Sequence, residues 1–292
     1  MTKSTSNGHP EFGEVDLSDV VFIMGTARSG STLLGSLLGG APDVFYAGEL
    51  ADWPTLMGAS TVPRSIPFWE KVRRRTGAPS DQSSGFKRLF EHPAGWAYPF
   101  AHRRLAAEYE RLAGQVLQAV AAESGCRTVV DSSHYPRRAR ALRRILGPNR
   151  VRLVYLVRRP SSIVRSFRST GDKGYWATHL YLLITSLIAW PVYLAHPRSQ
   201  RTIVTYEELA EAPLEVGRRA LGRPLIGVDP NHLPVPLVLI GNRFVKFGNE
   251  IKVEPPKRVD APSILDRLTD LVQWPFLLAR QLSVKQGLGG EG

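Results

Sequence analysis

The stretch that decides the fold is residues 20–38, which read VVFIMGTARSGSTLLGSLL. The residues from Val20 to Met24 form a continuous apolar run, which is typical of a buried strand. A turn rich in glycine and serine follows, and the residues from Thr32 to Leu38 then favour a helix. A strand, a glycine-rich turn and a helix in this order predict an α/β protein whose turn lies at the carboxyl edge of a parallel sheet.

The turn between this strand and helix has the spacing of a phosphate-binding loop, G-x-x-x-x-G-K-[ST]. Such a loop directs successive backbone N–H groups inward and places a helix N-terminus behind them, which creates an anion site. Ser31 stands where the usual lysine belongs, which argues against an ordinary kinase or GTPase. The candidate anion-binding residues are Gly25, Thr26, Ala27, Arg28, Ser29, Gly30, Ser31 and Thr32.

The rest of the chain continues the alternation of strands and helices. Further strands are expected at 128–130, 151–157 and 202–205, and helices at 101–124, 137–146 and 207–221. This pattern predicts a three-layer, P-loop-type α/β fold, with a parallel sheet flanked by helices, in a single domain over residues 16–283. Residues 1–15 are expected to be a disordered lead-in, 77–86 a loop or lid, and 284–292 a flexible tail.

The composition limits the kinds of molecule that the protein is expected to bind. Lysine and arginine number 38 against 26 acidic residues, so the net charge of +12 favours anionic ligands. The basic residues form short scattered clusters without a nucleic-acid-binding motif, so no nucleic acid partner is expected. The single cysteine, Cys126, excludes an internal disulfide framework. The start of the chain has no apolar run typical of a signal peptide, so we expect a cytoplasmic protein.

Residues 25–34 resemble the 5′-phosphosulfate loop of the sulfotransferases that use 3′-phosphoadenosine-5′-phosphosulfate (PAPS). The nearest spacing is that of the tyrosylprotein sulfotransferase branch, whose loop reads P-R-S-G-T-T-L. Residues 151–166, VRLVYLVRRPSSIVRS, resemble the family's 3′-phosphate motif, with Arg158 and Ser166 in the binding roles. Tyr206 stands in a segment similar to the family's Y-E-x-L motif, and Asn242 and Arg243 in one similar to its nucleotide-covering loop.

This resemblance implies transfer of a sulfuryl group from PAPS to a hydroxyl of a small-molecule, glycan or lipid acceptor. The alternative is a P-loop nucleotide or small-molecule kinase. No metal is expected, because no group of histidines or carboxylates has the spacing of metal ligands. Arg28 is expected to neutralise charge on the transferring group, because its guanidinium stays charged and can span two oxygens.

Two residues compete for the role of general base. Glu49 follows the short apolar run from Val44 to Tyr46, so we expect it at the carboxyl edge of a strand beside the loop. In the tyrosylprotein sulfotransferases a glycine–glutamate pair after the same helix supplies the base, which implies this role for Glu49. His134 stands where many family members have a lysine, and it is a candidate sulfonate donor, an alternative base or a structural residue.

Residues 175–195 are uncharged and strongly apolar. A buried helix is the favoured interpretation, and contact with a membrane surface is the alternative. A helix this apolar near the acceptor favours a lipophilic or aromatic substrate. Residues 265–282 predict a second apolar helix, broken by Pro275. No motif indicates the acceptor or the oligomeric state.

Overall fold

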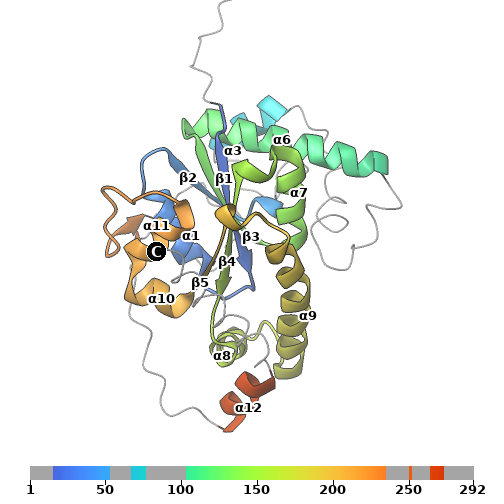
Figure 1. Ribbon diagram of the computed structural model, residues 1–292, viewed down its shortest axis with the longest axis vertical. Coiled ribbons are helices and arrows are strands. Elements are labelled where there is room, and N and C mark those ends of the chain that lie inside the picture. Colours follow the sequence, from blue (N-terminus) through green and yellow to red (C-terminus); the bar gives the residue numbers. More distant parts are fainter. Residues whose placement is uncertain (1–15, 53–66, 77–102, 235–249, 252–263, 273–292) are drawn as a thin grey trace, which may run out of the picture.

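Strand β1 is the centre of a five-stranded parallel sheet with the order β2-β3-β1-β4-β5 (Figure 1). The structure is a computed structural model, which describes residues 16–52, 67–76, 103–234, 250–251 and 264–272. The strands of the sheet are β1 (Asp19–Gly25), β2 (Val44–Gly48), β3 (Thr128–His134), β4 (Val151–Val157) and β5 (Arg201–Thr205). This sheet and the helices on both of its faces form one α/β domain, which confirms the predicted fold class.

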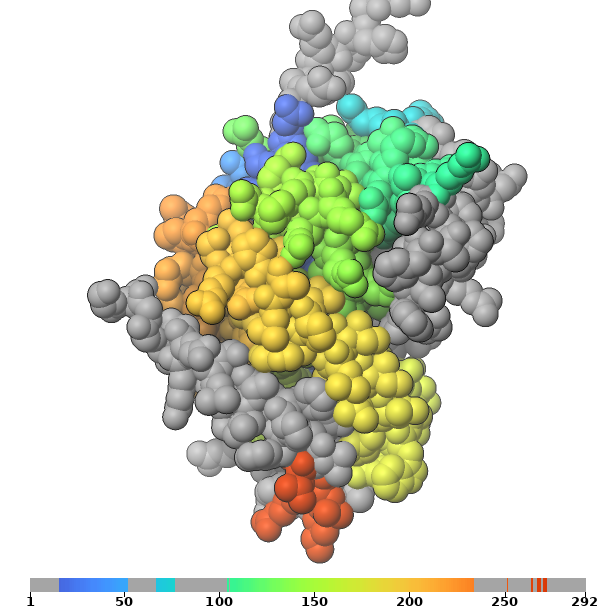
Figure 2. Space-filling view, turned by 45° about the vertical axis from the view of Figure 1, so that its right-hand side comes forward, coloured from blue at the N-terminus to red at the C-terminus, as the bar shows by residue number. Residues whose placement is uncertain are grey.

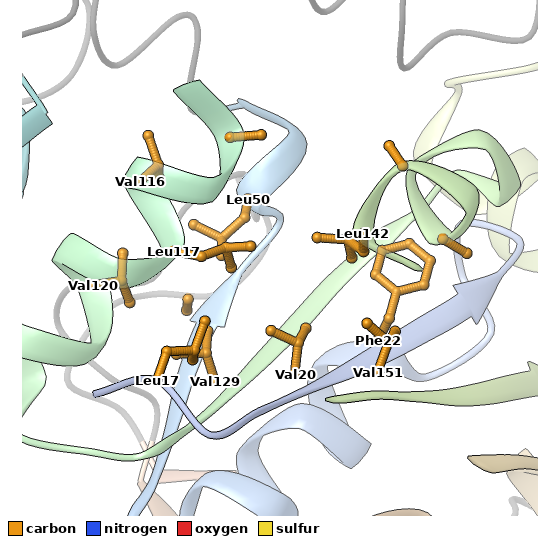
Figure 3. Packing of buried hydrophobic residues seen from close by; sticks show 14 of the residues in the cluster. Leu17, Val20, Phe22, Leu50, Val116, Leu117, Val120, Val129, Leu142 and Val151 are labelled. Atoms are coloured by element: carbon orange, nitrogen blue, oxygen red, sulfur yellow. The ribbon is translucent and has the colours of Figure 1, made fainter. Parts of the chain in front are cut away.

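The pattern of β1 explains its central place. Val20, Phe22 and Met24 enter the hydrophobic cluster on one face of the sheet, and Val21 and Ile23 enter the cluster on the other. A strand that is apolar on both sides fits only where helices cover both faces. Figure 3 shows the first cluster, in which Phe22 lies close to Leu142 and Val151.

The helices divide between the two faces, as Figure 1 shows. The first cluster contains side chains of α3 (Pro67–Thr76), α6 (Arg103–Ser124), α7 (Pro136–Leu146) and α9 (Tyr175–Leu194). The second contains side chains of α1 (Ser31–Gly39), α10 (Tyr206–Glu211) and α11 (Pro213–Leu221). Helix α8 (Pro160–Thr170) contacts both α9 and α12 (Ile264–Val272). Short 3₁₀ turns are η1 (Leu50–Asp52), η4 (Pro148–Arg150) and η5 (Arg198–Gln200).

Strand register brings the ends of separate strands to one edge. Met24 pairs with His134 and Gly25 pairs with Leu156, so β1, β3 and β4 end at nearly the same level. The residues that follow them therefore meet at the carboxyl edge, where ligands bind in open α/β sheets.

Two element boundaries differ from those predicted. The helix expected over 207–221 is divided into α10 and α11, because Pro213 cannot continue a helix and holds Ala212 at φ −137° and ψ 63°. Strand β3 continues beyond Val130 through buried polar residues as far as His134. These polar side chains fit inside the sheet because they bond to one another and to neighbouring elements.

Helix α9 is only half buried, so the expectation of a buried helix is wrong for its outer side. Leu182 and Ala189 lie in the interior, whereas Trp176 and Leu187 are 80% and 57% exposed. By length and composition alone, α9 is also the one helix in the described segments that is apolar enough to cross a membrane.

Several predicted features lie outside the described residues. These are the segments 1–15, 77–86 and 284–292, the break at Pro275, and the residues Asn242 and Arg243. Strands β6 (Leu233–Pro234) and β7 (Glu250–Ile251) pair antiparallel, and β6 contacts α1. The two ends of the segment that carries Asn242 and Arg243 therefore lie together beside α1.

We expect Gly25→Ala to lower the free energy of unfolding by about 1–3 kcal/mol, as overpacking does in other cores. A Cβ at Gly25 would lie 2.4 Å from the backbone oxygen of Leu156, so β1 and β4 would have to move apart. Chemical denaturation measures the change. Gly174→Ala is the matched control, because a Cβ there has nothing within 4 Å, and equal losses for the two variants would contradict this account.

Candidate active site

The phosphate loop connects β1 to α1 at the carboxyl edge of the sheet. Gly30 is the N-cap of α1 and has φ 99°, a left-handed conformation that glycine adopts without strain. Because Gly30 has no side chain, no side-chain cap bonds to the first turn of α1. The N–H groups of this turn have no partner within the helix and point to where an anion would lie. The loop is closed by a hydrogen bond from the Ser29 N–H to the Thr26 carbonyl, at 3.3 Å.

Arg158, the first residue after β4, lies against this loop. Its Nη1 donates a hydrogen bond to the carbonyl oxygen of Arg28 at 3.1 Å, and its guanidinium lies 4.2 Å from the centroid of the Tyr206 ring. Tyr206 in turn packs over Gly30, where an added Cβ would lie 2.5 Å from the ring. The structure thus brings Arg158, Tyr206 and the loop together. Ser166 lies half-buried on α8, and within the described residues its hydroxyl makes no hydrogen bond to Arg158.

The side chain of Arg28 points to the other end of α8. Its Nη2 lies 2.6 Å from Oδ2 of Asp172 and 3.2 Å from the Thr170 hydroxyl, and its guanidinium lies 5.8 Å from the Phe167 ring centroid. Helix α8 has 11 residues and therefore spans about 16 Å. Arg158 precedes this helix and the Arg28 guanidinium contacts its last residue, so the two cations lie towards opposite ends of α8.

Helix α9 also reaches the loop. The Ala27 N–H donates a hydrogen bond of 2.9 Å to the hydroxyl of Tyr181. Burial raises the pKa of Tyr181, so this hydroxyl stays protonated near neutral pH. Lys173 lies beside it, with Nζ 5.2 Å from the Tyr181 ring centroid. No local signal in the sequence indicates the participation of Tyr181, because 154 residues separate it from Ala27.

Glu49 and His134 meet at the same edge of the sheet. Glu49 follows β2 and His134 ends β3, and the His134 Nε2 lies 3.5 Å from the Glu49 Oε1. His134 has φ 67°, which is uncommon for a residue other than glycine and fits the abrupt turn into α7. Its Nδ1 is buried and has no hydrogen-bond partner in the described part of the chain. The two candidate bases are therefore neighbours and not alternatives in separate places.

A buried ion pair fixes the backbone next to Glu49. Oδ2 of Asp131 accepts a hydrogen bond of 2.6 Å from Nε of Arg138, and both side chains are at most 1% exposed. Oδ1 of Asp131 accepts from the Leu50 N–H and from Ser133, and the Ser133 hydroxyl accepts from the Ala51 N–H. This network was not predicted. The signal for it is an aspartate inside an apolar strand, which requires a nearby cation.

Tyr46 supports the network from β2. Its hydroxyl lies 2.9 Å from that of Ser132, and its ring fills the space above Gly35, where a Cβ would lie 2.3 Å away. Complete burial raises the pKa of Tyr46, so the phenol stays neutral and acts as a structural group. Within the described ranges, no group of three or more histidines, cysteines or carboxylates is placed to hold a metal ion.

Asp131→Ala should lower the free energy of unfolding by about 3–5 kcal/mol, because it leaves the Arg138 guanidinium buried without its carboxylate. The double variant Asp131→Ala/Arg138→Met should recover much of this loss, since it removes the unpaired charge. Denaturation curves of the three proteins measure both effects.

The matched control is Glu215→Ala, which breaks the pair with Arg218 on the surface of α11, where both side chains are about half exposed. Exposed pairs contribute little, so this variant should unfold almost like the parent protein. A loss for Asp131→Ala no larger than that of the control would show that the interior pair is unimportant.

Comparisons with known proteins agree with this geometry. The profile of the sulfotransferase family matches residues 20–223. A sulfotransferase domain from the curacin biosynthetic pathway superposes with a TM-score of 0.55, at 16% identity, over 89% of this chain and 98% of that one. The sulfotransferase domain of the Synechococcus PCC 7002 olefin synthase gives 0.53, at 19% identity, over 90% and 96%. No curated protein matches the chain. The structural matches show a shared fold, and the profile covers most of the chain, so this protein belongs to the sulfotransferase family.

Proposed function

We propose that this sulfotransferase takes its sulfuryl group from PAPS and transfers it to a hydroxyl of a small-molecule, glycan or lipid acceptor. The observation that carries the proposal is the contact of Arg158 with the phosphate loop. This contact places a cation, Arg158, beside the anion site of the phosphate loop. A donor that carries both a 3′-phosphate and a 5′-phosphosulfate needs two anion-binding positions close to each other. ATP, the donor of the alternative kinase reaction, has no 3′-phosphate.

In this proposal the N–H groups of the loop and of the first turn of α1 hold the 5′-phosphosulfate. Arg158 binds the 3′-phosphate, and Tyr206 holds the guanidinium in place through ring contact. Ser166, Asn242 and Arg243 are further candidates by resemblance to the family. No metal is required, because arginine and backbone dipoles can neutralise the charge that develops on the leaving oxygen.

The reaction forms one bond and breaks one. The acceptor oxygen attacks sulfur in line, the bond from sulfur to the bridging oxygen breaks, and adenosine 3′,5′-bisphosphate leaves with the electron pair. Glu49 takes the proton of the acceptor hydroxyl. His134, at 3.5 Å from the carboxylate, orients it and can accept the proton afterwards.

In this proposal Arg28 contacts the transferring sulfuryl group only after its guanidinium has left Asp172. Its guanidinium is paired with Asp172, and the two side chains are 18% and 22% exposed. A partly exposed pair of this kind is weak, so the more concentrated charge of a bound phosphosulfate can compete for the guanidinium.

The wall next to the loop favours an acceptor with an apolar part. Ile163, Val164, Phe167 and Leu182 form a small buried cluster, against which the partly buried Ala27, Tyr175 and Tyr181 pack. In this proposal an acceptor that places its hydroxyl near Glu49 covers the accessible parts of the two tyrosine rings, and burial of this apolar surface contributes to binding.

The test of the function is turnover of labelled PAPS with a panel of phenols, sterols and long-chain alcohols, with products identified by mass spectrometry. With an acceptor that reacts, we expect Glu49→Gln to lower kcat by about 10²–10⁴-fold, the usual contribution of a general base. Affinity for adenosine 3′,5′-bisphosphate should not change, because the carboxylate faces the acceptor.

Glu211→Gln, an exposed change on α10, is the control and should retain full turnover. A kcat of Glu49→Gln close to that of this control would remove Glu49 from the mechanism. The pH–rate profile of His134→Ala separates the two candidates, because loss of its acidic limb would transfer the role of base to His134.

The donor is tested by binding of adenosine 3′,5′-bisphosphate and of AMP, which lacks the 3′-phosphate. Arg158→Ala should weaken binding of the bisphosphate by about 10–100-fold relative to AMP, since a hydrogen bond to a charged group contributes about 1.5–3 kcal/mol. Comparing two ligands on one variant cancels any disturbance of the loop. Equal weakening for both ligands, or stabilisation of the parent protein by ATP–Mg²⁺ alone, would argue against PAPS.

A further inference from the structure

The side of α9 that faces away from the sheet is entirely apolar. This surface, here called the outer face of α9, consists of exposed residues spaced along one side of the helix, namely Trp176, Leu180, Ile184, Leu187, Pro191 and Leu194. No charged residue occurs between 175 and 195. In Figure 2 the helix forms a ridge on the face that comes forward, directly below α7.

The fold does not require this surface to be apolar. The opposite side of α9, with Leu182, Ala189 and Tyr193, is buried, and the helix contacts both β1 and α7. A surface helix normally places charged residues towards water, and a continuous exposed apolar stripe marks an interaction site. Because the inner side packs in the domain core, α9 can lie along a partner surface but cannot cross a bilayer without unfolding the domain.

Positive charge borders the outer face at its C-terminal end. A groove of about 350 Å³ lies between α7 and α9, and Pro191 belongs both to this groove and to the outer face. Its lining includes the cations Arg140, Arg143 and Arg144. Arg144 pairs with Glu110 and Arg143 bonds to the carbonyl of Ala195, whereas Arg140 has no partner within the described residues.

Further cations flank α9 in the sequence, and a second exposed apolar stripe lies on α12. Lys173 and Arg198, both exposed, lie just before and just after α9. Helix α12 adds an apolar stripe that consists of Ile264, Leu268 and Leu271, exposed by 80%, 50% and 65%. Asp270 bonds to the backbone and side chain of Ser161 and so fixes α12 to the start of α8. Both views place α12 at the same end of the molecule as the start of α9.

We propose that the outer face of α9 docks on the surface of an anionic lipid bilayer, with the arginines of the α7–α9 groove bound to lipid headgroups. An apolar stripe bordered by cations matches the layered chemistry of such a surface, with acyl chains below and negative charge above. A second copy of the chain fits less well, because it would bring together two surfaces of the same charge on proteins of net charge +12. This inference concerns binding alone and does not depend on the sulfuryl donor.

The experiment is sedimentation of the full chain with vesicles of phosphatidylcholine that contain about one quarter phosphatidylglycerol, against pure phosphatidylcholine. We expect binding to the anionic vesicles only, and weaker binding as salt rises. Leu180→Ser/Leu187→Ser, which keeps every charge, should lower the partition coefficient about tenfold or more. Emission from Trp176 should be quenched by brominated lipid, and Trp176→Phe should remove that part of the quenching.

Two matched controls separate docking from general attraction of a basic protein. Leu214→Ser/Ile226→Ser removes two exposed apolar residues elsewhere, and Arg73→Gln/Arg74→Gln removes the same charge from α3 as Arg140→Gln/Arg143→Gln removes from the groove. The controls should bind like the parent protein, apart from a small effect of net charge.

Three results would overturn the proposal. The first is no sedimentation of the parent chain with anionic vesicles at low salt. The second is equal loss of binding in the α9 or groove variants and in their controls. The third is light scattering that shows a dimer which Leu180→Ser/Leu187→Ser converts to a monomer while vesicle binding is unchanged, because the outer face would then belong to a second copy.

Discussion

The ion pair of Asp131 and Arg138 is the constraint on which the carboxyl edge of this sheet depends. A charge in the interior is tolerated only with a partner of opposite charge. Arg138 in the first turn of α7 therefore has to face the end of β3, which fixes the helix against the strand. The other carboxylate oxygen holds the Leu50 N–H, and Glu49 and His134 consequently emerge side by side.

Local patterns in the sequence were sufficient to predict most strands of the sheet and the phosphate loop. Continuous apolar runs predicted the strands, and the glycine-rich turn after Met24 predicted the phosphate loop, because both signals lie within a few neighbouring residues. The break at Pro213 was missed, although proline cannot stand inside a helix without loss of a hydrogen bond. The outer face of α9 could not be predicted, because a helix that is apolar all round gives no contrast to separate its buried side from its exposed side.

The residues that pair with the site residues could not be predicted from the sequence, for a different reason. Arg28 pairs with Asp172, 144 residues away, and nothing near either residue indicates the other. In this structure two groups expected to serve an anion are engaged by the protein itself, since Asp172 holds Arg28 and Tyr181 holds the Ala27 N–H. These two groups are therefore engaged before a sulfuryl donor binds, so binding at them exchanges one hydrogen bond for another, whereas the N–H groups of the first turn of α1 have no side-chain cap.

The bond from Ala27 to Tyr181 has one more consequence. The same helix that supplies this hydroxyl also carries the apolar residues that face solvent on its far side. An interaction that moves or stabilises α9 at its outer face therefore also affects the hydrogen bond between Tyr181 and the Ala27 N–H of the loop. Equilibrium coupling of this kind is reciprocal. Binding of the proposed nucleotide at the loop and docking of α9 are therefore expected to change each other's affinity by the same factor, through the hydroxyl of Tyr181.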